Sequence, residues 1–153
     1  MLTGIQHLHN FLRWFIVFFA FWTIFKSMSG MNGSRPFTKG DKRPSLLLMI
    51  TADIQLLLGL ILYFGNGWFK VLTSGGFMKL PAQRFWAIEH MVGMLIGIIF
   101  IHLGYSVAKK NIDDTAKFKK IFWFTLIGLA VILATIPWPF REAVGRGMFP
   151  GMN

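Results

Sequence analysis

Four apolar stretches, separated by shorter segments in which the charged residues gather, take up more than half of this chain. They cover approximately residues 11–28, 44–64, 85–107 and 121–137. A bilayer core about 30 Å thick requires about 17 to 25 mostly apolar residues in each helix that crosses it. The pattern therefore predicts an all-α fold, a polytopic membrane protein whose four transmembrane helices form one bundle.

Composition agrees with this prediction and limits the chemistry. Of the 153 residues, 54% are hydrophobic and 16% are aromatic, more than is usual in a soluble domain. The chain is long enough for a single domain, residues 1–153, in which the longest connection between spans, residues 65–84, is expected to be a Gly-containing loop. Cysteine is absent, so any metal would be bound by His, Met or carboxylate side chains.

The distribution of positive charge predicts an orientation. The net charge is +10, but the cations lie beside membrane spans, where they attract anionic lipid headgroups, so binding to nucleic acid is not expected. The connections between spans one and two and between spans three and four carry ten of the 16 Lys and Arg residues. By the positive-inside rule these connections are cytoplasmic, and both termini are periplasmic. Residues 1–10 lack a basic signal-peptide region, so the first span is expected to remain in the mature protein.

Helical phase separates the two histidines that precede the first apolar stretch. If the helix begins by His7, that residue shares a face with an aromatic stripe that suits contact with lipid. His9 instead aligns with Arg13 and with small or polar residues, which suit the inside of a membrane bundle because helices approach closely there. His9 is therefore the candidate for an interior role.

The third span repeats this arrangement. Gly93 and Gly97 lie within about 60° of His90 on a helical wheel, so a groove of glycines adjoins this imidazole. Such a groove can admit a neighbouring helix or a flat cofactor. Because the first and third helices run in the same direction, His9 and His90 are expected to face each other near the periplasmic end.

Two neutral imidazoles on facing helices are what haem iron takes as axial ligands. The sequence thus predicts one b-type haem (heme b) between His9 and His90, with Arg13 pairing with a propionate. Glu89 is a competing partner for Arg13, or an acceptor for an imidazole N–H. Two alternatives stay open: the histidines form a structural polar cluster, or His7, His9, His90 and Glu89 bind a non-haem metal if the segment before residue 10 is not helical.

A second polar pair is expected deeper in the membrane. His102 lies about 18 Å along the helix from His90, too far to share its iron. Asp53 in the second span lies at a comparable depth, so Asp53 and His102 are predicted to form a buried pair, for proton relay or for holding helices together. Gln55 lies on the opposite face of the second helix from Asp53, and only one of these faces can point at the bundle centre.

Several segments also resemble a known family. They read HLHNFLRW at residues 7–14, IQLLLGLILYF at 54–64, RFWAIEH at 84–90, GYSVAKK at 104–110 and IPWPFR at 136–141. Together they are similar to a family of short four-span membrane proteins of Gram-negative bacteria that are catalogued as cytochrome B-like. The resemblance implies a bacterial inner-membrane protein of the b-type cytochrome kind. The chain departs from the larger respiratory cytochromes b, which hold two haems with histidine pairs on two helices.

The expected function is electron transport through one haem near the periplasmic side, in an electron carrier or accessory protein and not a stand-alone enzyme. The expected partners are the lipid bilayer, a quinone or respiratory-chain component, and further copies of the chain in a homo-oligomer. The alternative is a non-catalytic membrane subunit that packs with a partner complex and whose histidines are structural or bind a non-haem metal.

Overall fold

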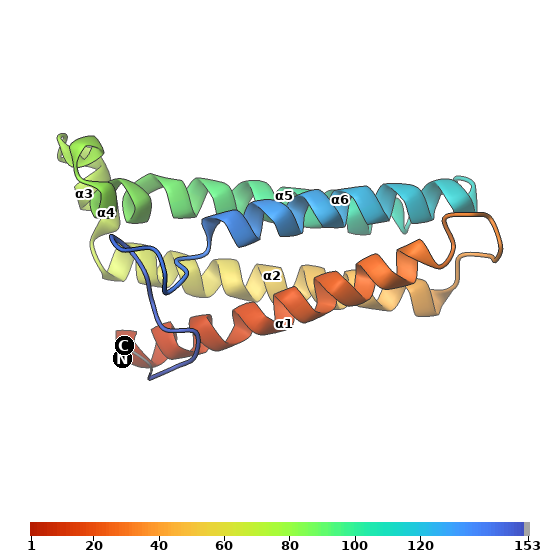
Figure 1. Ribbon diagram of the computed structural model, residues 1–153, viewed down its shortest axis with the longest axis horizontal. Coiled ribbons are helices and arrows are strands. Elements are labelled where there is room, and N and C mark those ends of the chain that lie inside the picture. Colours follow the sequence, from red (N-terminus) through yellow and green to blue (C-terminus); the bar gives the residue numbers. More distant parts are fainter. Residues whose placement is uncertain (152–153) are drawn as a thin grey trace.

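Four long helices pack side by side in an elongated bundle in the computed structural model of this chain, which describes residues 1–151 (Figure 1). They are α1 (Leu2–Met28), α2 (Lys39–Gly65), α5 (His90–Val107) and α6 (Asp114–Thr135). Together with the turns that lead into it, α5 forms a continuous third span from Pro81 to Val107, and all four spans are long and apolar enough to cross a membrane. The predicted all-α, four-helix membrane bundle is confirmed, and the chain is a multi-pass membrane protein.

The two ends of the bundle differ in what they carry. Helices α1 and α5 run in one direction and α2 and α6 in the other, so the N-terminus and the chain that follows α6 lie at the same end (Figure 1). This end, called the terminus end below, also carries the short helices that connect α2 to α5. The opposite end, called the basic end, carries the connections 29–38 and 108–113.

The helices extend beyond the apolar stretches that predicted them. Helix α1 begins at Leu2 and α6 at Asp114, each well before the expected span, because helical structure continues through the polar residues outside the apolar segment. The Asp113 side chain accepts a hydrogen bond from the backbone N–H of Ala116 at 3.1 Å and caps α6. At its other end α6 stops at Thr135, two residues earlier than predicted.

The connection between α2 and α5, which was expected to be a loop, contains short helices instead. These are α3 (Trp68–Thr73), η1 (Phe77–Lys79) and α4 (Pro81–Arg84). Gly67 and Gly76 precede the first two in the left-handed region, with φ of 76° and 77°, a conformation that glycine adopts without steric cost. The prediction of an irregular loop was wrong because it counted the glycines as loop formers and overlooked the helices that they start.

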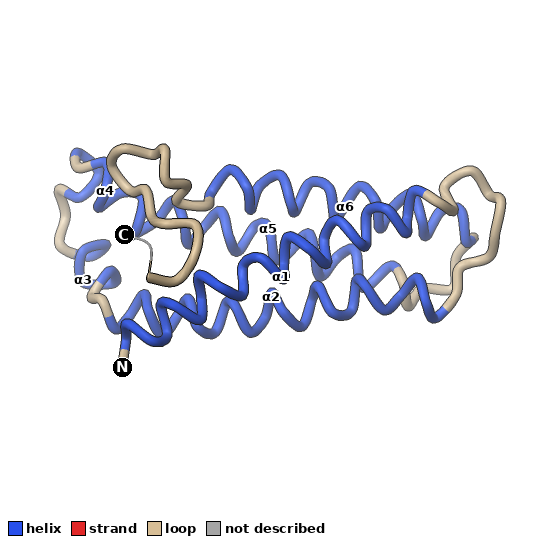
Figure 2. The backbone as a smooth tube through the Cα atoms, turned by 60° about the horizontal axis from the view of Figure 1, so that its bottom comes forward, coloured by secondary structure: helices blue, strands red, loops and turns tan. Residues whose placement is uncertain are grey.

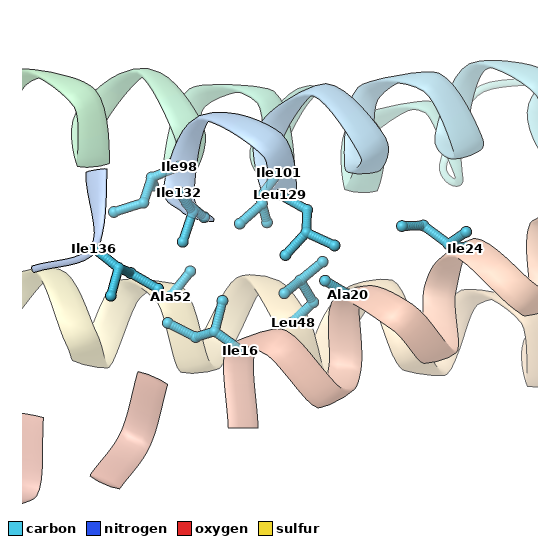
Figure 3. Packing of buried hydrophobic residues seen from close by; sticks show 10 residues of the cluster. All are labelled: Ile16, Ala20, Ile24, Leu48, Ala52, Ile98, Ile101, Leu129, Ile132 and Ile136. Carbon is cyan, nitrogen blue, oxygen red and sulfur yellow. The ribbon is translucent and has the colours of Figure 1, made fainter. Parts of the chain in front are cut away.

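The core lies between the α1–α2 pair and the α5–α6 pair. Figure 3 shows its side chains pointing into the space between the four helices. They are Ile16, Ala20, Ile24, Leu48, Ala52, Ile98, Ile101, Leu129, Ile132 and Ile136. The predicted inward face of α1 is confirmed by the burial of its small and polar residues, and the aromatic stripe is largely exposed, with Phe18 60% and Phe25 64% accessible.

The basic end is held by one network around a carboxylate. Asp41 is buried and accepts hydrogen bonds from Arg35, through Nη2 at 2.7 Å and Nη1 at 2.8 Å. It also accepts from the backbone and the hydroxyl of Thr38, at 2.9 and 2.7 Å, which forms the capping box of α2. The hydrogen bonds to Asp41 raise the pKa of Arg35 above its ordinary value. This network joins the first connection to the start of α2.

The chain that follows α6 folds back over the first turns of α1, as Figures 1 and 2 both show. Arg13 donates from Nη2 to the carbonyl oxygens of Gly147, at 2.9 Å, and Met148, at 2.5 Å. Trp14 donates from Nε1 to the Met148 carbonyl at 3.0 Å, and its ring stacks on Phe149. Residues 137–151, called the C-terminal tail below, are thereby attached to α1.

Candidate cofactor site between two histidines

His9 and His90 face each other at the terminus end of the bundle. Their ring centroids are 6.5 Å apart and their planes are inclined by 67°. His9 lies in the third turn of α1, and His90 is the first residue of α5. The side-chain amide of Gln55 on α2 donates to the backbone carbonyl of His9 at 2.8 Å, which fixes α1 against α2 at this level. The two histidines that the sequence placed on inward faces are thus brought together.

A cavity of about 140 Å³ adjoins the two rings and is lined from all four long helices. Its apolar wall includes Leu56, Leu60, Met91, Met94, Ile132 and Ile136. Along the third span the lining extends from Trp86 to Ile98, which is about 18 Å of helix. The cavity therefore extends along the bundle beside the two histidines.

A proline after α6 accounts for the orientation of the His90 ring. In a continued helix the carbonyl of Thr135 would accept from the N–H of residue 139, but Pro139 has none. That carbonyl instead lies 2.9 Å from Nδ1 of His90. Because a carbonyl oxygen only accepts, the neutral ring carries its proton on Nδ1 and has its lone pair on Nε2. Pro137 frees the carbonyl of Leu133 in the same way, and Trp138 donates to it from Nε1 at 2.8 Å.

Three buried polar atoms along the cavity have no hydrogen-bond partner among residues 1–151. They are Nδ1 of His9, Nε of Arg13 and Oε1 of Gln55. All three residues line the cavity. Buried polar groups are nearly always hydrogen-bonded, so several without a partner around one cavity indicate a site for a ligand or for water.

A π-helical turn places two aromatic rings against His90. This turn, η2, covers Phe85–Glu89, and the His90 N–H donates to the carbonyl of Phe85 five residues earlier. The i to i+5 bond brings Phe85 close to His90, with ring centroids 5.6 Å apart, and Trp86 lies 5.5 Å from the same ring. Single π turns of this kind occur often at functional sites.

Two arginines of the C-terminal tail lie over these aromatic rings. The guanidinium of Arg141 lies 4.8 Å from the centroid of Phe85, and that of Arg146 lies 4.7 Å from the centroid of Trp86. Burial lowers the pKa of Arg146 from its ordinary value. The tail thus places two positively charged groups on the two aromatic rings that contact His90.

The ligand types at the cavity, two imidazoles from facing helices, are those that a b-type haem takes. His9 and His90, with ring centroids 6.5 Å apart, are the residues that would hold the iron, which would supply a one-electron redox couple. Haem needs only two ligands from the protein because the macrocycle supplies the others. The available Nε2 of His90, the buried Nδ1 of His9 and the apolar walls are consistent with this ligand set.

The glycine that contacts the site is not one of the two that were predicted to do so. Gly93 and Gly97 were expected to admit a macrocycle, but both pack against α6, where a Cβ on Gly97 would come within 2.6 Å of Ile132. They serve the close contact of α5 with α6, so that part of the prediction was wrong. Gly59 on α2, which the sequence did not single out, lies beside His9, and a Cβ there would meet Cε1 of that ring at 3.3 Å.

The charged residues predicted for the site have other partners. Glu89 accepts from Nε of Arg84 at 2.6 Å and does not line the cavity, so its predicted role as a partner of Arg13 or of an imidazole is wrong. Arg13 lines the cavity but binds the carbonyls of the tail through Nη2. Its Nε remains without a partner among the described residues.

The condition for a non-haem metal site is not met. That alternative required an extended segment before residue 10, whereas α1 is helical from Leu2. On a helix the rings of His7 and His9 point about 200° apart. Between residues 1 and 151, no three or more His, Asp or Glu side chains lie close enough together to hold a metal ion.

The second predicted polar pair forms, but not in the interior. Nε2 of His102 lies 2.7 Å from Oδ1 of Asp53, while 45% and 43% of the two side chains are exposed. The prediction that this pair is buried was wrong. The face of α2 that points into the bundle is the opposite one, with Thr51, Gln55 and Gly59.

Thr135, Gly59 and the tail arginines were not predicted as parts of this site. The two prolines after α6 were a signal for a free carbonyl, but only the packing of α6 on α5 shows that it meets His90. Comparisons of the chain with protein-family models, curated proteins and solved structures found no match. The resemblance to cytochrome B-like proteins therefore stays a prediction, and the function is argued from this geometry.

Proposed function

We propose that this chain is a b-type cytochrome-like electron carrier that holds one haem between His9 and His90. The observation that carries the proposal is the pair of facing imidazoles, with centroids 6.5 Å apart, beside a mostly apolar cavity. A haem bound there would supply a one-electron redox couple. The chain would supply the ligands, their orientation and the charges around them.

Each imidazole has a distinct support. The Thr135 carbonyl holds the proton of His90 on Nδ1 and so keeps Nε2 available to a metal, an arrangement common for ligand histidines. His9 is held through its backbone by Gln55, and its side chain lies against Gly59, where no Cβ restricts it. His90 is therefore fixed through its ring, and His9 through its helix.

The tail arginines would favour the reduced state. Arg141 and Arg146 each lie on an aromatic ring that packs on His90, and Arg13 lines the same cavity. Positive charge beside a redox centre disfavours the loss of an electron, so these residues are expected to raise its reduction potential. The Arg13 Nε and the guanidinium of Arg146, both lining the cavity, are the groups available to propionates.

The orientation is part of the proposal. Ten cations gather at or near the basic end and six elsewhere in the sequence, so the positive-inside rule places the basic end in the cytoplasm. The cofactor site at the terminus end would then lie on the periplasmic side of a bacterial inner membrane. A redox partner would exchange electrons with the chain from that side.

The absorption spectrum of the purified protein tests the function. We expect b-type bands in the reduced-minus-oxidised spectrum, their loss in His90→Ala and in His9→Ala, and their retention in the matched control His7→Ala. A folded, helical protein that shows no Soret band, even after incubation with hemin, would contradict the proposal and favour a non-catalytic membrane subunit. Bands that survive His90→Ala but vanish in His7→Ala would overturn the ligand assignment.

A further inference from the structure

The pair formed by Asp53 and His102 lies on the outer surface of the bundle, in the groove between α2 and α5. The two side chains are joined by a 2.7 Å hydrogen bond, yet nearly half of each is exposed. The bond uses one carboxylate oxygen and one ring nitrogen. Each residue therefore keeps a second polar atom, Oδ2 or Nδ1, for a further partner.

The pair is located at a depth where lipid offers no such partner. Asp53 follows Arg43 by ten residues, about 15 Å of helix, and His102 precedes Lys109 by seven residues, about 10 Å. The hydrocarbon core is about 30 Å thick, so both residues lie well inside it. Ionisable groups at this depth almost always face protein or a water-filled cavity, because hydrocarbon cannot satisfy them.

The residues around the pair are apolar and equally exposed. One turn away on α2 lie Ile50 and Leu57, and on α5 lies Ile99, with 43%, 61% and 56% of their surfaces accessible. A face that is apolar along its length and polar at one level is typical of a contact between membrane helices. The face formed by Ile50, Asp53, Leu57, Ile99 and His102 is called the α2–α5 face below.

We infer that the α2–α5 face binds the same face of a second copy of this chain, which forms a two-fold dimer in the membrane. All copies cross the bilayer in one orientation, so two copies necessarily present the polar pair at the same depth. A two-fold contact requires a self-complementary surface. The pair meets this requirement, because Oδ2 of Asp53 and Nδ1 of His102 are both unused, and a proton shared between the carboxylate of one copy and the ring of the other makes the same hydrogen bond twice. Any other protein would need its own matching polar group at that level.

The inference is independent of the haem proposal. The α2–α5 face shares no polar residue with the cavity at His9 and His90, and His102 lies about 18 Å along α5 from His90. A monomer that binds haem and a dimer that does not are therefore distinguishable results.

Cross-linking in native membranes tests the dimer directly, because the chain has no cysteine of its own. Single-cysteine variants Ile50→Cys, Leu57→Cys and Ile99→Cys probe the α2–α5 face. Phe18→Cys on α1 and Trp123→Cys on α6, at residues that are 60% and 56% exposed, are the matched controls. Under mild oxidation we expect a covalent dimer from at least one face variant, and at most slow formation from the controls.

The polar contribution is tested by the double variant Asp53→Leu/His102→Leu in the cross-linking background. It replaces two polar side chains with apolar ones on a surface inside the hydrocarbon core, so the variant is expected to fold. Its dimer affinity is expected to fall by at least about threefold, the scale of an interhelical hydrogen bond in a membrane. Co-purification of two differently tagged copies gives a second readout. The inference is overturned if no face variant cross-links faster than the controls, if tagged copies do not co-purify, or if the double variant dimerises as tightly as the parent.

Discussion

The carbonyl oxygen of Thr135 lies 2.9 Å from Nδ1 of His90 and joins the end of α6 to the start of α5. This contact exists because α6 ends there: neither Pro137 nor Pro139 has an N–H to continue the helix. The helical conformation is also disfavoured for the residue before a proline, and Ile136 accordingly has an extended backbone conformation. A local helix stop thus determines which nitrogen of a distant histidine is free.

Restoring the missing donors should therefore weaken the site. In the double variant Pro137→Ala/Pro139→Ala, α6 can continue by a turn, and the N–H of residue 139 competes with His90 for the Thr135 carbonyl. Loss of a hydrogen-bond partner of a ligand histidine costs about 10- to 100-fold in affinity for the metal group. We expect hemin affinity, measured by titration of the Soret band, to fall on this scale while helical content by circular dichroism rises slightly.

The control for this experiment is Pro150→Ala, in the exposed end of the C-terminal tail, which should leave hemin affinity unchanged. Unaltered affinity in the double variant would show that the Thr135 contact does not orient a ligand.

Gly59 offers a test that separates binding from stability. A Cβ at this position would lie 3.3 Å from Cε1 of His9, so Gly59→Ala should push the imidazole by a few tenths of an ångström. Alanine is favoured over glycine in a helix by about 0.5 to 1 kcal/mol, so the fold should be as stable as before or slightly more so. We expect lower hemin affinity with an unchanged or raised melting temperature.

Gly4→Ala is the matched control on α1, because a Cβ there meets nothing within 4 Å. It should share the gain in helix stability without a change in the spectrum. Equal hemin affinity in Gly59→Ala and Gly4→Ala would place the cofactor away from His9.

The sequence predicted the four helices well because each must expose apolar side chains to lipid along its whole length. It also placed His9 on the inward face, because small and polar residues recur there at helical spacing. The burial of Arg13, Ala20, Thr23 and Ser27 follows that spacing. Periodicity within one helix was sufficient for these predictions.

Predictions that depended on pairs of helices were less successful. Gly93 and Gly97 lie near the face of His90 on a wheel, but a wheel does not show whether the adjoining space holds a cofactor or α6. Asp53 and Gln55 occupy opposite faces of α2, and nothing in the sequence decides which one points inward. The depth of Asp53 and His102 was predictable, but their exposure depends on how α2 and α5 are rotated in the bundle.

Arg13 should control how firmly the C-terminal tail covers the cofactor site. Its guanidinium binds the carbonyls of Gly147 and Met148, and a hydrogen bond from a charged donor contributes about 1.5 to 3 kcal/mol. Replacing Arg13 with Met keeps the length of the side chain and removes the bonds. We expect faster tryptic cleavage after Arg141 and Arg146 in Arg13→Met, measured by mass spectrometry of timed digests.

Lys70→Met, also at the terminus end, is the control for a lost positive charge and should not change the cleavage rate at the tail. Tail cleavage that is equally slow in Arg13→Met and in the parent would mean that the stacking of Phe149 on Trp14 is sufficient to hold the tail.

The Arg35–Asp41 contact at the basic end should be sensitive to the shape of the cation as well as to its charge. The carboxylate of Asp41 is buried and binds two guanidinium nitrogens of Arg35, at 2.7 and 2.8 Å. A lysine retains the charge but lacks the planar fork, so Arg35→Lys leaves part of a buried carboxylate unsatisfied. A loss of about 1 to 3 kcal/mol in the free energy of unfolding, measured by denaturation in mixed micelles, is expected.

Arg43→Lys, at a position without an ion pair among residues 1–151, should cost much less. Equal losses in the two variants would mean that the network around Asp41 adds no stability beyond the charge itself.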